Sequence, residues 1–183
     1  MLERPEPATT AIILIDMQEK LTRAMTNIDA VVNRQQLLLR GAGLLGLPVV
    51  ATEQYPQGLG ATIPGLAELL PPGSKVVEKT SFSCFDEPCF TGELAARSYR
   101  TLIIAGCEAH VCVQQTVLDA LARDHQVILA ADAVTSRFQH NIDWALALGR
   151  ESGAAVMSVE AALFWLLRDA THPEFRALSK LVR

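Results

Sequence analysis

The chain has few of the residues that mark several large classes of protein. Its 183 residues include only 4 cysteines and 5% aromatic residues, and 16 basic against 20 acidic residues give a formal net charge of -4. Four cysteines are too few for a disulfide-stapled scaffold. A weakly acidic chain also lacks the electropositive field that binds nucleic acids or anionic membranes. We therefore expect reduced thiols, no nucleic-acid partner and no membrane partner.

Long apolar runs and a secretory leader are missing as well. No stretch of about 18 uninterrupted apolar residues is present to span a bilayer. The N-terminal Met-Leu-Glu-Arg-Pro-Glu-Pro has no basic segment followed by an apolar core. Together with the small number of cysteines, these features predict a cytoplasmic protein. The length and the 50% hydrophobic content predict a single domain over residues 1–183 with a sizeable core.

Short apolar runs alternate with segments of helical periodicity along the chain. Six runs suit strands that are buried on both faces, at residues 11–15, 48–51, 75–77, 101–105, 126–130 and 154–157. Five segments repeat apolar residues at helical spacing, at residues 28–45, 111–123, 142–151, 160–169 and 173–181. This alternation predicts an α/β fold in which helices cover both faces of a parallel sheet, a three-layer α/β/α arrangement.

Polar and reactive residues follow the predicted strands. Asp16 follows the first, Glu53 the second, Lys79 the third, residues 106–112 the fourth and Asp132 the fifth. Right-handed crossovers bring the carboxyl ends of parallel strands to one edge of the sheet, where ligands bind in such folds. The sequence therefore predicts a functional site at this edge.

Further residues beside these strands are candidates for a substrate pocket. They are amide and aromatic side chains, which suit a small, partly aromatic site: Gln18, Gln54, Tyr55, Phe82 and Phe85. Ordinary loop packing explains each of them equally well. We expect a small-molecule substrate there.

The segment Gly41-Ala-Gly43-Leu-Leu-Gly46 matches the glycine fingerprint of dinucleotide-binding proteins. In that motif the glycines follow a strand and open a helix, whose N–H groups face a pyrophosphate. Here they end a predicted helix and precede a predicted strand, and the C-terminus of a helix presents carbonyl groups that repel phosphate. We interpret the glycines as a helix exit and expect no nicotinamide or other cofactor.

Cys112 lies at the start of the predicted helix 111–123. The first turn of a helix has unpaired N–H groups and the positive end of the helix dipole, which favour a thiolate and can stabilise an oxyanion. Asp16 can accept the thiol proton, and Lys79 can balance the resulting negative charge. Taken singly, Asp16 also suits a turn or helix cap and Lys79 a solvated loop, so position alone leaves the triad open.

Other interpretations stay open on the same residues. His110, two residues before Cys112, is a second candidate base. Cys107 with Cys112 is a candidate redox pair, and Cys84 with Cys89 repeats the same spacing, which lies at the edge of the range for zinc ligands. We expect no metal. The apolar last third of the chain, ending in residues 164–167, can supply contacts for a homo-oligomer, including a catalytically idle scaffold.

Three separated motifs resemble the isochorismatase-like cysteine hydrolases, and they occur in the order found in that family. They are Leu14-Ile-Asp-Met-Gln18, Glu78-Lys-Thr-Ser-Phe-Ser83 and Gly106-Cys-Glu-Ala-His-Val-Cys-Val113. Segments 52–56, 131–137 and 164–173 are similar to the subgroup called isochorismatase domain-containing proteins. The resemblance implies a six-stranded parallel sheet between helices, with Rossmann-like topology.

The resemblance also implies a mechanism. Cys112 would attack the carbonyl of an amide or related C–N bond, Asp16 would act as general base, and Lys79 would activate the pair. A non-proline cis peptide at Cys107–Glu108 would direct the N–H of Glu108, with that of Cys112, at the oxyanion. An acyl-enzyme thioester would then be hydrolysed by water.

Two departures from the family narrow this expectation. The family's nicotinamidases carry metal-binding histidines after the second strand, whereas residues 52–58 contain no histidine. The true isochorismatases lack the nucleophilic cysteine, so Cys112 argues against the reaction after which the family is named. The resemblance leaves the substrate open.

Overall fold

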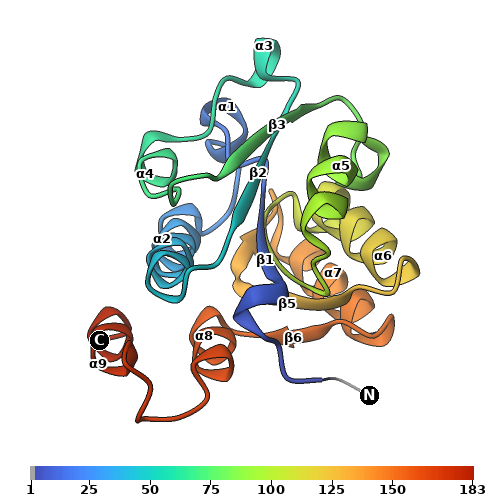
Figure 1. Cartoon of the computed structure of the whole chain (residues 1–183). Helices are drawn as coiled ribbons and strands as arrows, with labels where there is room; N and C mark the ends of the chain where they lie inside the picture. Colours follow the sequence, from blue (N-terminus) through green and yellow to red (C-terminus); the bar gives the residue numbers. More distant parts are fainter. Residues whose placement is uncertain (1–2) are drawn as a thin grey trace.

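The computed structural model describes residues 3–183, and its centre is a six-stranded parallel sheet (Figure 1). The strand order is β3-β2-β1-β4-β5-β6, and each neighbouring pair is parallel. The strands are β1 (Thr10–Ile15), β2 (Val49–Gln54), β3 (Lys75–Lys79), β4 (Thr101–Cys107), β5 (Gln126–Thr135) and β6 (Ala155–Met157). The predicted α/β class with six parallel strands is confirmed.

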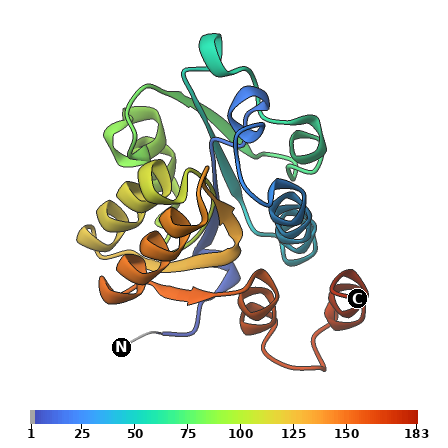
Figure 2. The same cartoon turned by 180° about the vertical axis from the view of Figure 1, so that it is seen from behind.

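Helices cover both faces of the sheet (Figures 1 and 2). One layer consists of α2 (Ile28–Leu45), α8 (Val159–Leu167) and α9 (Phe175–Leu181). The other consists of α5 (Pro88–Arg97), α6 (Gln114–Ala122) and α7 (Gln139–Glu151). Shorter turns connect these elements: η1 (Pro7–Thr9), α1 (Glu19–Thr22), α3 (Pro56–Leu59), α4 (Pro64–Ala67), η2 (Cys84–Asp86) and the π-helical turn η3 (Ala109–Val113).

The central strands are buried on both faces, as their unbroken apolar sequences predict. All six residues of β1 are buried. Successive side chains of a strand point to opposite faces, so Ile12 and Leu14 pack with the α2 layer and Ile13 and Ile15 with the α6 layer. Two apolar cores, one on each face, therefore hold the strand rigidly up to its last residue before Asp16.

The strand order changes direction after β3, so that β1 and β4 become neighbours at the centre of the sheet. From β1 the chain moves through β2 to β3, and it then returns to the other side of β1 for β4, β5 and β6. The carboxyl ends of strands at such a switch point form a crevice for ligands. Gly106 allows close approach here, because its φ is +124° and an added Cβ would lie 2.1 Å from the carbonyl oxygen of Ile15. A side chain at position 106 would push β4 away from β1.

Several strands extend further than their apolar runs. Glu53 lies inside β2 and Lys79 is the last residue of β3, because the backbone pairing of the two strands continues to Gln54 and Lys79. Asp132 lies within β5, beside an irregularity where the β4–β5 register shifts. Its carboxylate accepts a hydrogen bond of 2.8 Å from the N–H of Val159. The expectation that these three residues follow their strands was therefore wrong.

The glycines at 41–46 end a helix, as predicted. Gly41 and Gly43 are inside α2, and Gly46 caps it in the left-handed conformation with φ 65°. Left-handed glycine is a common way to stop a helix. The N–H of Leu47 then bonds to the carbonyl of Ala42 at 2.9 Å, and β2 begins two residues later at Val49.

The segment expected to make subunit contacts lies largely inside the molecule. Leu163, Leu166 and Leu167 of α8 are at most 2% exposed, and they belong to the core on the α2 side of the sheet. Phe164 packs edge-on against Phe175 of α9, with ring centroids 6.5 Å apart. The α2 layer therefore occupies this apolar surface. Within residues 3–183, no helix is long and apolar enough to cross a membrane.

Candidate active site

Asp16 and Lys79 form a buried ion pair at the carboxyl edge of the sheet. Lys79 Nζ donates to Asp16 Oδ2 at 2.8 Å, and both side chains are 0% exposed. Thr52 Oγ1 donates to the other oxygen, Oδ1, at 2.7 Å. Asp16 has a left-handed φ of 52°, a conformation that aspartate adopts more readily than most residues. The turn after β1 thus holds a carboxylate with a donor on each oxygen.

Lys79 is surrounded by acceptors. Its ammonium group also donates to Gln54 Oε1 at 2.6 Å, to the carbonyl of Ser81 at 3.1 Å and to that of Phe82 at 3.3 Å. Burial alone lowers the pKa of Lys79, but attraction to Asp16 and to the thiol of Cys112 outweighs burial and leaves the pKa raised. Lys79 is therefore a fixed positive charge at neutral pH.

Cys112 lies in η3, the π-helical turn that leads into α6, and is 6% exposed. Burial raises the pKa of its thiol to about 12; the charge of Asp16 raises it too, whereas Lys79 lowers it. The pKa of Cys112 is therefore raised, whereas a helix N-terminus and a nearby lysine predict that it is lowered. Desolvation of the anion outweighs both of those effects. The resting side chain is a thiol with a carboxylate beside it.

This raised pKa predicts how the thiol reacts with alkylating agents. In a Cys89→Ser variant, which removes the exposed thiol, iodoacetamide should label Cys112 slowly at neutral pH. Below its pKa, the thiolate fraction grows about tenfold per pH unit, so the labelling rate should climb steadily between about pH 7 and about pH 10. The rate is measured by intact-mass spectrometry. A plateau below about pH 9 would show a thiolate of low pKa and contradict the prediction.

Cys84 approaches the same site, which spacing in the sequence left undecided. It is fully buried, and burial raises the pKa of its thiol to about 11. Its N–H donates to Thr116 Oγ1 at 3.1 Å, and that hydroxyl donates to the carbonyl of Cys112 at 2.7 Å. Thr116 thus links the segment after β3 to the segment that carries Cys112.

Cys107 is held against the backbone of the turn after β1. Its thiol donates to the backbone carbonyl of Asp16 at 3.2 Å and is fully buried. The peptide bond Cys107–Glu108 is cis, as the resemblance implied. The carboxylate of Glu108 bonds to Arg137 at 3.0 Å, and its carbonyl accepts from the N–H groups of Val111 and Val113.

Both ring nitrogens of His110 are engaged away from Cys112. Nδ1 lies 3.0 Å from Ser136 Oγ, and Nε2 lies 3.2 Å from Asn141 Nδ2. Because Asn141 Nδ2 can only donate, Nε2 accepts and Nδ1 carries the proton. His110 therefore ties η3 to the start of α7.

The amide and aromatic residues predicted for a pocket have different surroundings. Gln18 is buried and binds backbone groups of Gln54 and Gly60, so it fixes the loop after β2. Gln54 contacts Lys79 directly. Tyr55 and Phe82 are each 55% exposed, whereas Phe85 packs in the core against Phe90, with ring centroids 5.3 Å apart.

Sequence patterns did not single out Thr52 or Thr116. Threonine is common in strands and helices, so neither residue carries a signal on its own. Thr52 belongs to β2 and Thr116 to α6, and their roles arise only when the fold brings them to Asp16 and Cys112. Within residues 3–183, no three His, Cys, Asp or Glu side chains converge as metal ligands would.

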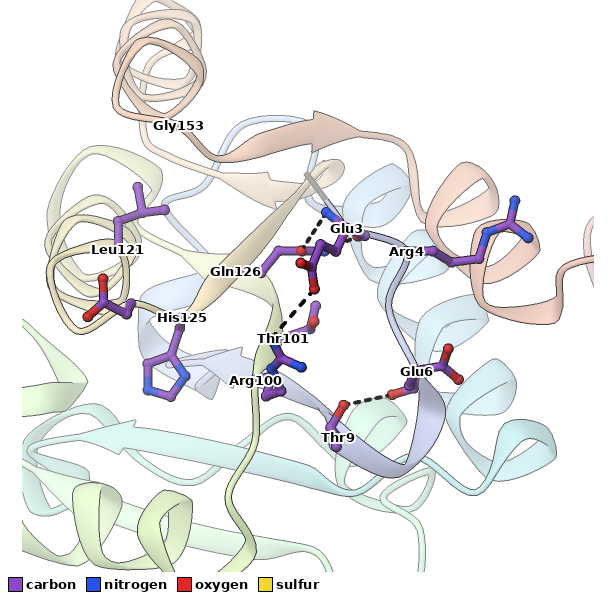
Figure 3. Close-up of a pocket in the computed structure, with 11 residues that line it drawn as sticks. Glu3, Arg4, Glu6, Thr9, Arg100, Thr101, Leu121, His125, Gln126 and Gly153 are labelled. Carbon is purple, nitrogen blue, oxygen red and sulfur yellow. Dashed lines mark hydrogen bonds and ion pairs between the residues drawn. The ribbon is translucent and has the colours of Figure 1, made fainter. Parts of the chain in front are cut away.

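A cavity of about 620 Å³ opens at the opposite edge of the sheet (Figure 3). Its walls include Thr9, Arg100 and Gln126, which lie where β1, β4 and β5 begin. Figure 3 shows Glu3 bonded to Gln126 and paired with Arg100, the ion pair spanning 3.5 Å. These polar groups satisfy one another and anchor the N-terminal segment, and none belongs to the Asp16–Lys79–Cys112 cluster.

Comparisons with known proteins agree with this architecture. The Isochorismatase domain model matches residues 10–161. Isochorismatase domain-containing protein 2 of Bos taurus is 42% identical over all of this chain and 87% of its own length, and the human protein of that name is 39% identical over the same shares.

Solved structures show the same fold. The MAR1 ribonuclease of Caenorhabditis elegans superposes with a TM-score of 0.93 at 33% identity, over 98% of this chain and 92% of its own. The YcaC gene product of Escherichia coli, an octameric hydrolase of unknown specificity, superposes with a TM-score of 0.87 at 23% identity, over 97% of this chain and 95% of its own. From the domain match and the full-length relatives, the chain belongs to the isochorismatase family.

Proposed function

We propose that this protein is a cysteine hydrolase that cleaves an amide or related C–N bond of a small molecule through an acyl-enzyme thioester. The observation that carries the proposal is the buried 2.8 Å Lys79–Asp16 ion pair, with the buried thiol of Cys112 close enough that both of these charges shift its pKa. Nucleophile, base and fixed cation are the parts that covalent catalysis needs.

Asp16 activates the nucleophile as it attacks. The pKa of Cys112 is raised to about 12 by burial, so the thiol keeps its proton until a carbonyl carbon lies within reach. Sulfur then bonds to that carbon while the proton passes to Asp16. Lys79 stays protonated and offsets the negative charge that the site carries before and after the transfer. The carbonyl π electrons move to oxygen, which gives a tetrahedral oxyanion.

The backbone around Cys112 supplies the oxyanion donors in this proposal. The N–H groups of Glu108 and Cys112 are assigned this role, since the first N–H groups of a helical turn have no intrahelical acceptor. Protonated Asp16 then gives its proton to the leaving nitrogen, and the C–N bond breaks to leave a thioester. Water then attacks the thioester carbon while Asp16 takes its proton, the C–S bond breaks, and protonated Asp16 returns the proton to the sulfur of Cys112 as the carboxylic acid leaves.

A small substrate suits the site better than a nucleic acid. One relative is named a ribonuclease, but this chain has a formal net charge of -4, which opposes the phosphate contacts that dominate nucleic-acid binding. Gln54, Tyr55 and Phe82 beside the ion pair are our candidates for substrate contacts. The four free cysteines fit a reducing compartment, and we assign the reaction to the cytoplasm.

The test is a search for the acyl-enzyme. The protein is incubated with acetamide, benzamide, nicotinamide and N-acetyl amino-acid amides, quenched in acid and measured by intact-mass spectrometry. At least one amide should add its acyl mass to the protein, and peptide mapping should place that mass on Cys112.

Two variants sharpen the search. Cys112→Ala should give no adduct, and Cys89→Ser, which changes only an exposed thiol, should give the wild-type adduct. An adduct on another residue, or no adduct and no product from any amide, would contradict the proposed function and favour an idle scaffold of the same fold.

A further inference from the structure

Helix α7 presents an aromatic surface to the outside of the molecule. Trp144 is 66% exposed, Phe138 just before the helix is 56% exposed, and Leu148 is 37% exposed. The rings of Phe138, His140 and Trp144 contact one another in a row. Phe138 and His140 lie parallel with centroids 5.6 Å apart, and His140 and Trp144 have centroids 4.9 Å apart. Exposed apolar patches of this kind mark interaction sites.

The exposed residues inside the helix form one face because they recur at spacings of three and four, and Phe138, which caps the helix, stacks on the first of them. We call this the α7 face: Phe138, His140, Trp144, Ala147, Leu148 and Glu151. The opposite side of α7, with Ile142, Ala145 and Gly149, is buried against the sheet. Figures 1 and 2 show α7 beside α6 in the outer helix layer.

Two charged residues of opposite sign lie along one side of the α7 face, one near each end. Asp143 and Arg150 are both exposed, and their separation of seven positions, about two helical turns, places both on the same side of the helix. Among the described residues, neither has an oppositely charged partner within 4.0 Å. Asp143 accepts only a neutral hydrogen bond, from Gln139 at 2.9 Å. The acidic group is near one end of the apolar face and the basic group near the other.

We propose that the α7 face binds the α7 face of a second copy of the chain in an antiparallel pair about a two-fold axis. Such an interface is self-complementary, so each contact occurs twice. With the axis near residues 146–147, Trp144 packs beside Leu148 of the second copy, and Asp143 lies opposite Arg150 of the second copy. In this antiparallel arrangement each acidic residue therefore faces the basic residue of the other copy. This charge complementarity favours a second copy of the chain over another partner.

The test is a charge exchange measured by sedimentation velocity. The wild-type chain should sediment as an even-numbered assembly whose smallest unit has twice the 19.9 kDa mass of the chain. Asp143→Arg or Arg150→Asp places like charges opposite each other twice, which should raise the dissociation constant by about 100-fold or more. The double variant Asp143→Arg/Arg150→Asp restores both pairs and should restore assembly.

Matched controls separate this interface from general effects of charge. Glu68→Arg makes the same change of charge beside α4, on the other face of the sheet, and should leave assembly unchanged. Trp144→Glu should dissociate the pair, and circular dichroism checks that each variant is folded. A monomeric wild type, an assembly unaffected by Asp143→Arg, or a double variant that stays dissociated would each overturn the proposal.

Discussion

Replacing Lys79 with methionine should lower the free energy of unfolding by about 3–5 kcal/mol, because it leaves the buried charge of Asp16 without its cation. Both side chains are 0% exposed, so water does not replace the lost partner. Methionine retains the length of the side chain and limits the cavity. The measurement is urea unfolding of both proteins, with the m-value held as a check that the unfolded states are alike.

A double variant tests whether the loss comes from the unpaired charge. In Asp16→Asn/Lys79→Met, both charges are gone, and the amide oxygen of asparagine can still accept from Thr52. Removing both partners of a buried pair costs far less than removing one, so most of the stability should return. The coupling energy of the cycle should exceed about 1 kcal/mol. Strictly additive losses would show that Lys79 stabilises the fold by packing alone.

The pH dependence of this contribution follows from the raised pKa of Lys79. A group whose pKa is higher in the folded protein stabilises it fully below the unfolded pKa, about 10.4 for lysine. This stabilisation is lost as pH rises through the folded value. The difference between wild type and Lys79→Met should therefore hold from neutral pH to about pH 10 and shrink above it.

The strands were predictable because the sheet is buried on both faces. A strand such as β1, with every residue buried, has an unbroken apolar sequence that no surface element shows. Strand ends were less predictable. The apolar run of β5 ends before Asp132, but the strand continues beyond an irregularity there and pairs with β4 again at Val134 and Thr135. The short helices α1, α3 and α4 have four residues each, which is too few for a periodic signal.

The candidate site was predictable in position and less so in its chemistry. Asp16 and Lys79 were found because each lies at the carboxyl end of a short apolar run, and the topology brings such ends together. The sequence did not predict that Asp16 and Lys79 touch, that Thr52 bonds to Asp16 or that Cys84 lies nearby. These contacts join residues that are far apart in the sequence, and only the tertiary structure sets their distances. The pKa of Cys112 was expected in the wrong direction, because the helix turn and the lysine are visible in the sequence and the extent of burial is not.

Replacing Cys112 with alanine should abolish turnover of an acyl substrate and leave the fold intact. Removal of a nucleophile from a triad costs about 10⁴-fold or more in rate, and the remaining oxyanion donors do not form a thioester. p-Nitrophenyl acetate serves as a general acyl probe, with the rate followed by release of nitrophenolate. The urea midpoint should stay close to that of wild type, because the alanine leaves the Lys79–Asp16 pair in place.

Asp16→Asn shows whether the thiol and the carboxylate act as one unit. Asparagine keeps one acceptor oxygen, which can accept from Lys79, and its NH2 group can donate to Thr52 Oγ1, but it takes no proton. The buried thiol of Cys112, whose pKa is raised mainly by burial, should therefore keep its proton and react very slowly. Groups that act together give non-additive losses, so Asp16→Asn/Cys112→Ala should be no slower than Cys112→Ala alone. Near-normal acylation in Asp16→Asn would assign the base to another residue. Wild-type turnover in Cys112→Ala, with Cys89→Ser as the matched control, would remove the nucleophile from the mechanism.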